Sequence, residues 1–185
     1  SMNKYAYILQ NGISIEKNLK EAARYYKMSA DEDDAEGNAQ YGNILFNGIG
    51  LPVNHNEGFK CFKKAAEKSH NVGLCGMGYM MKEGFGTFRN KSQGAEYLKM
   101  AGEKGNADAM FYYAEMVKEG DGIPINKKEA ANWYKKAADN NHVTAMYKYA
   151  EIVKNGDGVP CDCTEALKYY KKAADNGNVD AMVEY

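Results

Sequence analysis

The apolar and small residues of this chain recur every 36 residues. Large apolar side chains occupy one register, at Tyr5, Tyr41, Met77, Tyr113, Tyr149 and Tyr185. A small residue directly follows the first five of them, at Ala6, Gly42, Gly78, Ala114 and Ala150. Glycine recurs with the same period at Gly12, Gly48, Gly84, Gly120 and Gly156. Because no insertion or deletion breaks these registers, the pattern predicts an array of stacked repeats.

Each repeat is predicted to contain two helices. Between residues 107 and 119 the apolar positions are spaced by three and four, which is the helical period. The segment from Gly120 to Pro124 then ends this helix, because Gly tolerates a left-handed C-terminal conformation and Pro cannot continue a helix. A second helix is expected from about residue 127 to residue 140, with Trp133 and Tyr134 on its apolar face. The small registers predict close crossing of the helices.

The second helices share a start signal. A capping residue recurs at Asn18, Asn54, Asn90, Asn126 and Asp162, and a Glu or Gln follows three positions later at Glu21, Glu57, Gln93, Glu129 and Glu165. This is the capping-box pattern, in which the cap accepts a backbone N–H and the Glu or Gln reaches back. At the other end, Gly105, Asn141 and Gly177 tolerate a left-handed conformation, while Asn106 and Asn178 can cap the next helix.

The registers define the repeat boundaries. We place the repeats at residues 1–34, 35–70, 71–106, 107–142 and 143–178, followed by a partial helix over 179–185. Neither end carries a polar capping helix, so we expect a single array that forms part of a longer protein.

Composition narrows the classes of function. The 185 residues are 44% hydrophobic and 26% charged, which is typical of a folded globular protein. The net charge of −1 lacks the basic excess that nucleic-acid binders use against phosphates. No run approaches the roughly 18 to 20 apolar residues that span a bilayer. We therefore expect a protein or peptide partner, with no nucleic acid and no direct membrane insertion; the oligomeric state stays open.

The repeat resembles the Sel1-like repeat family, which is related to tetratricopeptide repeats. The fourth repeat carries the motif as Ala109, Tyr113-Ala114, Gly120-Asp121-Gly122-Ile123-Pro124, Ala130, Trp133-Tyr134 and Lys136-Ala137-Ala138, and the fifth repeat carries it in the same registers. The sequence departs from the motif at Ser14, Glu16, Phe88, Gly94 and Gly102, and it lacks the paired cysteines of disulfide-rich members. The resemblance implies an all-α fold, a right-handed α–α superhelical solenoid of about five 36-residue helix-turn-helix repeats, used as an adaptor or scaffold.

In related solenoids the first helix of each repeat lines the concave surface where a partner binds. The positions that face this groove give a set of expected binding residues: Phe46, Tyr79, Lys82, Phe111, Glu115, Lys118, Tyr147, Glu151 and Lys154. Aromatic side chains beside charges are typical of peptide-binding surfaces. Two other interpretations stay open, since pairs such as Glu115 and Lys118 can simply solvate a helix, and the aromatic rings can belong to the core.

The predicted function is that of a non-catalytic protein-protein interaction scaffold. The alternative is a repeat module that positions a catalytic or ligand-binding domain outside this segment. We expect no catalytic residue and no cofactor, because the Gly120-x-Gly122 loop follows a helix and recurs, unlike a phosphate loop. The acidic run 31–34 falls in a turn register, which favours a solvated turn over a cation site.

The sequence predicts no metal site either. His70 and His142 lie two repeats apart, and His55 lies in a different loop. The cysteines have no repeated spacing; they are Cys61, Cys75, Cys161 and Cys163. This favours free thiols over a disulfide or a metal site, and free thiols in turn favour a cytoplasmic compartment. Cys61 falls in a core register, whereas Cys161 and Cys163 are the most accessible candidates for a reactive thiol.

Overall fold

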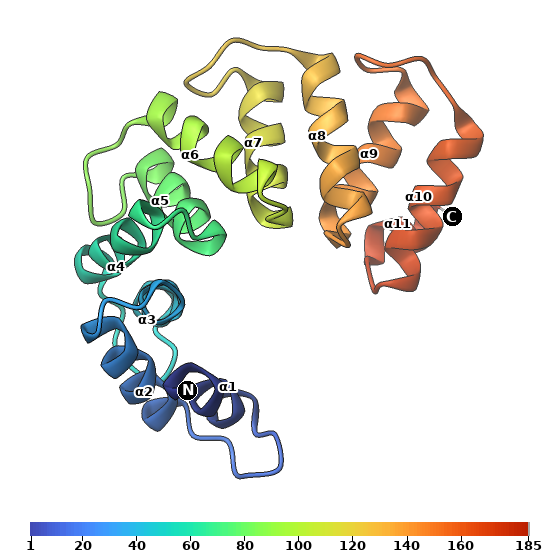
Figure 1. Ribbon diagram of the computed structural model, residues 1–185. Helices are drawn as coiled ribbons and strands as arrows, with labels where there is room; N and C mark the ends of the chain where they lie inside the picture. The colour runs from blue at the N-terminus through green and yellow to red at the C-terminus, as the bar shows by residue number, and fades with distance from the viewer. Residues whose placement is uncertain (185) are drawn as a thin grey trace. The chain divides into compact units, whose positions relative to one another are not determined.

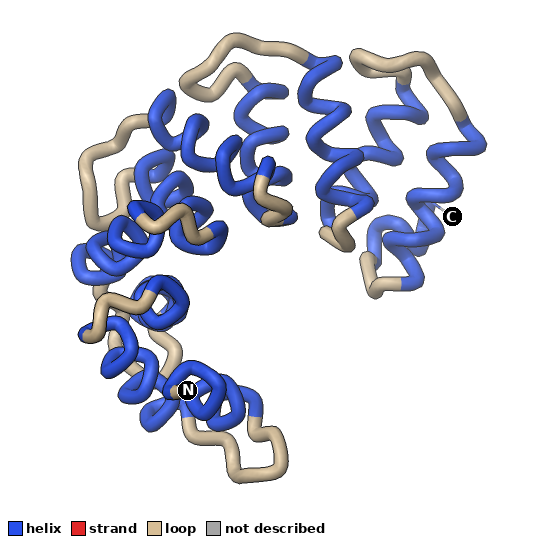
Figure 2. Tube along the Cα trace, viewed as in Figure 1, coloured by secondary structure: helices blue, strands red, loops and turns tan. Residues whose placement is uncertain are grey.

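The computed structural model describes residues 1–184, and every regular element in that range is an α-helix (Figures 1 and 2). Contacts divide the chain into two compact units, Ser1–Tyr97 and Leu98–Tyr185. Unit 1 contains α1 (Met2–Asn11), α2 (Leu19–Asp31), α3 (Ala35–Asn47), α4 (His55–Glu67), α5 (Asn71–Glu83) and the start of α6 (Lys91–Glu103). Unit 2 contains the end of α6, α7 (Ala107–Glu119), α8 (Lys127–Asp139), α9 (Val143–Asn155), α10 (Cys163–Asp175) and α11 (Val179–Glu184).

Helices with odd numbers are the first helices of the repeats, and helices with even numbers are the second helices. The predicted all-helical array is confirmed, with two helices in each 36-residue period. The predicted partial helix at the end of the chain is observed as α11, while Tyr185, the last residue of that prediction, lies outside the described residues.

The small registers lie where the two helices of a repeat cross. A Cβ atom on Gly58 of α4 would lie 3.3 Å from the carbonyl oxygen of Gly42 on α3. A Cβ on Gly94 of α6 would lie 2.8 Å from the carbonyl oxygen of Gly78, which is closer than real Cβ atoms approach. The expectation that small residues permit close helix crossing is therefore confirmed.

The large apolar register fills the space beside these crossings. In unit 2, Tyr113 packs edge-on against Trp133, with ring centroids 5.2 Å apart, and Tyr149 packs in the same way against Tyr169 at 4.7 Å. The Tyr113 hydroxyl donates a hydrogen bond to the Glu129 carboxylate at 3.1 Å. The ring is thus buried while its polar end is satisfied at the edge of the core.

One half of the predicted capping box is confirmed and the other half is wrong. The Asn126 side chain accepts a hydrogen bond from the backbone N–H of Glu129 at 3.0 Å, and the other four capping registers make the same bond. The backbone N–H of Asn126, however, donates to the carbonyl of Val117 on α7 at 3.0 Å. The chain reverses direction at this loop. The backbone N–H of the cap residue therefore meets a carbonyl group in the last turn of the first helix, and that carbonyl group has no hydrogen-bond partner within the helix. Glu129 therefore accepts from the Asn126 side chain instead, at 3.2 Å.

The first and second glycines of the loops have different roles, and the first repeat has Ser14 in place of the second glycine. The first one ends the first helix in the left-handed region, with φ between 68° and 83°, as predicted. The second one packs against the preceding repeat, where a Cβ on Gly158 would lie 2.6 Å from the backbone of Lys127, the first residue of α8. Gly50 approaches the backbone of Leu19 in the same way, at 2.7 Å. The loop is therefore a contact between consecutive repeats.

Candidate partner-binding site

The structure brings two of the expected binding residues of unit 1 into contact. Phe46 of α3 and Tyr79 of α5 pack edge to face, with ring centroids 5.8 Å apart. His55, the first residue of α4, and Phe85, from the loop after α5, complete the group. The His55 and Phe85 rings lie 4.9 Å apart, and Phe46 lies 5.3 Å from His55. We call these four residues the aromatic cluster; Phe85 is the most exposed of them, at 36%.

Lys82 lies on the same first helix as Tyr79 and forms an ion pair with the adjacent residue, Glu83. Its Nζ atom lies 2.5 Å from the carboxylate of Glu83, and both side chains are largely covered. The charge of Lys82 is therefore already balanced within α5.

In unit 2, Phe111 and Glu115 of α7 are tied to the helices that follow them. The Phe111 ring stacks on His142, with centroids 4.5 Å apart and planes within 16° of parallel, and it meets the edge of Tyr134 at 6.0 Å. The Tyr134 hydroxyl donates a hydrogen bond to the Glu115 carboxylate. Burial raises the pKa of Tyr134, and the Glu115 hydrogen bond raises it further. Both residues are thus half-buried and ordered by packing.

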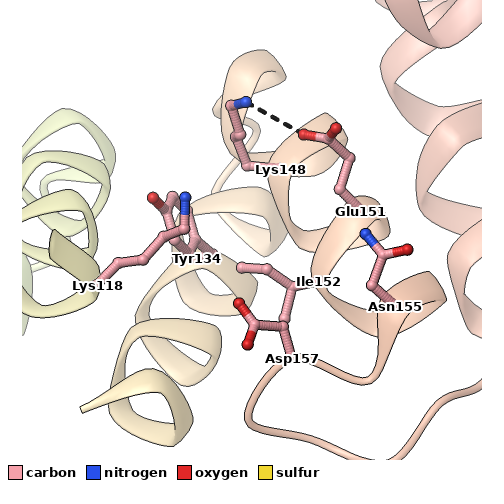
Figure 3. Close-up of a pocket in the computed structure, with 7 residues that line it drawn as sticks. All are labelled: Lys118, Tyr134, Lys148, Glu151, Ile152, Asn155 and Asp157. Carbon is pink, nitrogen blue, oxygen red and sulfur yellow. Dashed lines mark hydrogen bonds and ion pairs between the residues drawn. The ribbon is translucent and has the colours of Figure 1, made fainter. Parts of the chain in front are cut away.

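A pocket of about 220 Å³ lies next to these residues (Figure 3). We call it the α7–α9 pocket, because it lies between one residue of α7 and four residues of α9, while α8 and the loop after α9 add one residue each. Its lining residues are Lys118, Tyr134, Lys148, Glu151, Ile152, Asn155 and Asp157. Two of the expected binding residues, Lys118 of α7 and Glu151 of α9, therefore face one pocket.

The charged groups of the α7–α9 pocket alternate in sign and have partners within the protein. The Lys148 ammonium lies 3.1 Å from the Glu151 carboxylate, as Figure 3 shows. Lys118 lies 3.2 Å from Glu119, and Asp157 lies 2.8 Å from Lys127. A surface that offers both signs of charge within a short distance suits the mixed polar groups of a peptide better than a cluster of anions.

The remaining two expected residues, Tyr147 and Lys154, also lie on α9. The Tyr147 hydroxyl donates to Glu151 at 3.3 Å, and burial together with that carboxylate raises the pKa of Tyr147. Lys154 lies 2.6 Å from Glu184 and 5.7 Å from the centre of the Tyr170 ring. The expected residues are thus half-exposed, apart from exposed Lys154.

Reasoning from the sequence missed His55, Phe85, Lys148 and Asp157, which lie beside the expected residues. His55 and Phe85 are 30 residues apart, and so are Lys127 and Asp157, which form an ion pair in the equivalent place. The two members of this pair change together, from aromatic in one repeat to charged in another. That joint change was the signal that would have located the contact.

The cysteines differ sharply in exposure. Cys61 is 6% exposed, and burial raises the pKa of its thiol to about 11, so its prediction as an inert core residue is confirmed. Cys161 and Cys163 are exposed, in the loop before α10 and at its first residue. All four thiols are free in this structure.

His70 and His142 stand at the N-cap positions of the first helices α5 and α9. The Nε2 atom of His70 lies 2.9 Å from the carboxylate of Glu36, and Nδ1 of His142 accepts the backbone N–H of Ala145 at 3.1 Å. Within residues 1–184, no three His, Cys, Asp or Glu side chains are grouped so that they could hold a metal ion. No helix of the described chain has the length and apolar character needed to cross a membrane.

The repeat geometry agrees with a known family. A model of the Sel1 repeat matches residues 1–34, 35–70, 72–106, 107–142 and 143–178. The chain belongs to the Sel1 repeat family. Sel1 repeat proteins are generally protein-interaction scaffolds, and the repeat is a non-catalytic scaffold fold.

Solved Sel1 structures resemble the chain over nearly its whole length. A Sel1 repeat protein from Oxalobacter formigenes is 29% identical, with a TM-score of 0.85, and the match covers 98% of this chain and 72% of that protein. A protective antigen present in uropathogenic Escherichia coli strains is 26% identical, with a TM-score of 0.83, over 97% of this chain and 38% of the antigen. Cysteine-rich protein B of Helicobacter pylori shares the fold at 20% identity and a TM-score of 0.57, over 71% of this chain and 98% of its own. No curated protein matches the sequence.

Proposed function

We propose that this Sel1 repeat array is a non-catalytic scaffold that binds a protein partner on its first-helix face. The face consists of Phe46, Tyr79 and Lys82 in unit 1, and of Phe111, Glu115, Lys118, Tyr147, Glu151 and Lys154 in unit 2. The observation that carries the proposal is the α7–α9 pocket, where expected residues from two repeats, Lys118 and Glu151, face one hollow.

The contacts of unit 2 support this function in two ways. Phe111 and Glu115 are held by His142 and Tyr134, so a partner would meet a surface that is already ordered. An ordered surface loses little conformational entropy on binding. In addition, Lys118 and Glu151 present opposite charges at the rim of the pocket, which can select a partner through complementary charges.

Affinity capture with charge-reversal variants tests the proposal. Lys118→Glu should remove the partner proteins that the wild-type chain captures, because it reverses a charge at the pocket without disturbing the buried core. Lys128→Glu is the matched control, since Lys128 is an exposed lysine on the second helix α8. The proposal is wrong if both variants retain the same partners as the wild type, or if both lose them equally.

The alternative is that the array positions a catalytic or ligand-binding domain elsewhere in a longer protein. This chain spans only 38% of the Escherichia coli antigen, so a structural relative can be much longer than this segment. Capture of the same partners by the 185-residue chain and by the full-length protein would favour the scaffold. Partners that bind only the full-length protein would favour the alternative.

A further inference from the structure

The loop between α5 and α6, residues 84–90, differs from the equivalent loops of the array. Phe88 stands where the fourth and fifth repeats have Pro124 and Pro160, and Phe85 stands where the fifth repeat has Asp157. Phe88 is 94% exposed, the most exposed of the large apolar side chains in the described chain. An almost fully exposed Phe contributes little buried area to the fold, and aromatic residues are enriched at protein interfaces relative to the rest of the surface.

The other phenylalanine of this loop is fixed in place. Phe85 contacts His55 with ring centroids 4.9 Å apart and Phe46 at 5.9 Å, and it lies 6.4 Å from Tyr79. Its exposed edge is therefore presented by a packed aromatic cluster that joins two consecutive repeats. Rigid aromatic side chains are effective anchors for a partner, since little side-chain freedom is lost when they are covered.

Arg89 directly follows Phe88 and gives the same loop a positive charge. Its Nε and Nη2 atoms donate to the backbone carbonyl of Glu83, at 3.3 and 3.2 Å. Arg89 forms no ion pair with any carboxylate among the described residues, and it is exposed. A guanidinium group has five N–H donors, so several remain for a carboxylate brought by a partner.

We propose that Phe85, Phe88 and Arg89 form a docking site for a protein segment that presents a large apolar side chain next to a carboxylate. The apolar side chain covers the exposed edge of Phe85 and the Phe88 ring, while the carboxylate pairs with Arg89. This inference rests on the proposed scaffold function and adds the chemistry of the partner, at a loop of unit 1 that shares no residue with the α7–α9 pocket.

The site is tested with a random 12-residue peptide library displayed on phage and selected on the wild-type chain. Selected peptides should carry Phe, Trp or Leu close to Asp or Glu. Their affinity, measured by fluorescence anisotropy on synthetic copies, should fall about tenfold or more with Phe88→Ser and with Arg89→Glu, a change that corresponds to about 1.4 kcal/mol. Ile125→Ser is the matched control, because Ile125 is an exposed apolar residue, at 63%, in the equivalent loop of the next repeat.

The fold is controlled by the choice of variant. Because Phe88 is almost fully exposed, Phe88→Ser should leave the melting temperature unchanged, so a loss of binding reflects the loss of the side chain itself. Failure to select any acidic and apolar peptide would overturn the inference, and so would peptides that bind Phe88→Ser as tightly as wild type.

Two further outcomes separate this inference from other possibilities. Peptides whose binding is lost with Lys118→Glu but kept with Phe88→Ser would support the scaffold function and overturn the loop site. Co-sedimentation with vesicles of phosphatidylserine and phosphatidylcholine that depends on Phe88 would show a lipid-binding loop, and would likewise overturn the proposal. We expect neither result. For the vesicles, the reason is that Arg89 and its neighbours offer few charges for a lipid surface.

Discussion

The hydroxyl group of Tyr134, a fully buried residue of α8, donates a hydrogen bond to the half-exposed carboxylate of Glu115 on α7. This bond joins the core of the fourth repeat to its first-helix face. Tyr134 also lines the α7–α9 pocket, so one side chain supports both the packing of α8 and the wall of the candidate site.

Tyr134→Phe should lower the free energy of unfolding by about 2 kcal/mol, the contribution typical of a hydrogen bond to a charged group. For a chain of this length the melting temperature should fall by roughly 4–8 °C. Glu115→Gln should cost much less in the Tyr134→Phe background than in the wild type, because the bond is then already absent. Tyr25→Phe is the control, since Tyr25 is partly buried and its hydroxyl makes no hydrogen bond in the described chain. The prediction would be contradicted if the losses in unfolding free energy of the two single variants added up to the loss of the double variant.

Gly158→Ala should be clearly more destabilising than Gly105→Ala. Both residues have positive φ, 83° and 89°, so each alanine pays the strain of the left-handed region, about 1–2 kcal/mol. A Cβ at Gly105 meets nothing within 4 Å, whereas one at Gly158 would clash with the backbone of Lys127 at 2.6 Å. The clash should add about 1–3 kcal/mol. Urea unfolding of the two variants measures the difference, and equal midpoints would refute a close contact between the repeats.

Stability should decrease as the pH falls below about 6.5, in part through His142. Burial lowers the pKa of His142, and its Nδ1 atom must be unprotonated to accept the Ala145 N–H. Below the unfolded-state pKa of His142, near 6.5, the unfolded chain binds a proton at this residue more readily than the folded chain does. The free energy of unfolding therefore decreases as the pH falls towards the folded-state pKa. Melting temperatures measured between pH 7.5 and 5 test this.

His142→Asn is the matched variant for the pH experiment. Asn106 occupies the same register one repeat earlier and caps α7 through its side chain at 2.9 Å. Asn at position 142 should therefore keep the cap of α9 while removing the titrating ring. Its melting temperature should vary less with pH than that of the wild type; an unchanged pH profile would assign the effect to another group.

Three of the four thiols should fall into two reactivity classes with Ellman's reagent under native conditions. Exposed Cys161 and Cys163 should react within minutes, while Cys61, buried and with its pKa raised to about 11, should react only after unfolding in urea. Burial and the neighbouring Cys163 and Asp162 also raise the pKa of Cys161, so the rate should increase with pH above neutrality. A Cys161→Ser/Cys163→Ser variant should lose the fast class, and its persistence would contradict the assignment.

Much of the fold could be predicted because each local signal repeats five times. Gly120 and its equivalents end the first helices, and Asn126 and its equivalents start the second helices, as expected. The reverse arm of the capping box could not be predicted, because the backbone N–H of Asn126 goes to Val117 only after the chain has folded back on itself. Helical periodicity describes each helix separately and contains no information about this contact.

The candidate site was predicted less completely, for a related reason. The groove residues were chosen by their position on the first helices, and this placed Phe46 beside Tyr79 and Lys118 beside the pocket. His55 and Phe85 lie outside the first helices, in registers that otherwise serve capping and turns. A period alone separates shared positions from variable ones. Only the joint change of positions 30 residues apart, from aromatic to charged, indicated which variable positions touch across repeats.

The pairing of residues 30 apart makes the third and fifth loops of this protein non-interchangeable. His55 meets Phe85 in one place and Lys127 meets Asp157 in another, so each loop is matched to the repeat before it. A shuffled array with the third and fifth loops exchanged would set Asp157 against an imidazole in an aromatic cluster and Phe85 against a lysine. The order of these repeats therefore depends on the contacts at their junctions. Duplication or deletion of one repeat would require compensating substitutions on both sides of the new boundary.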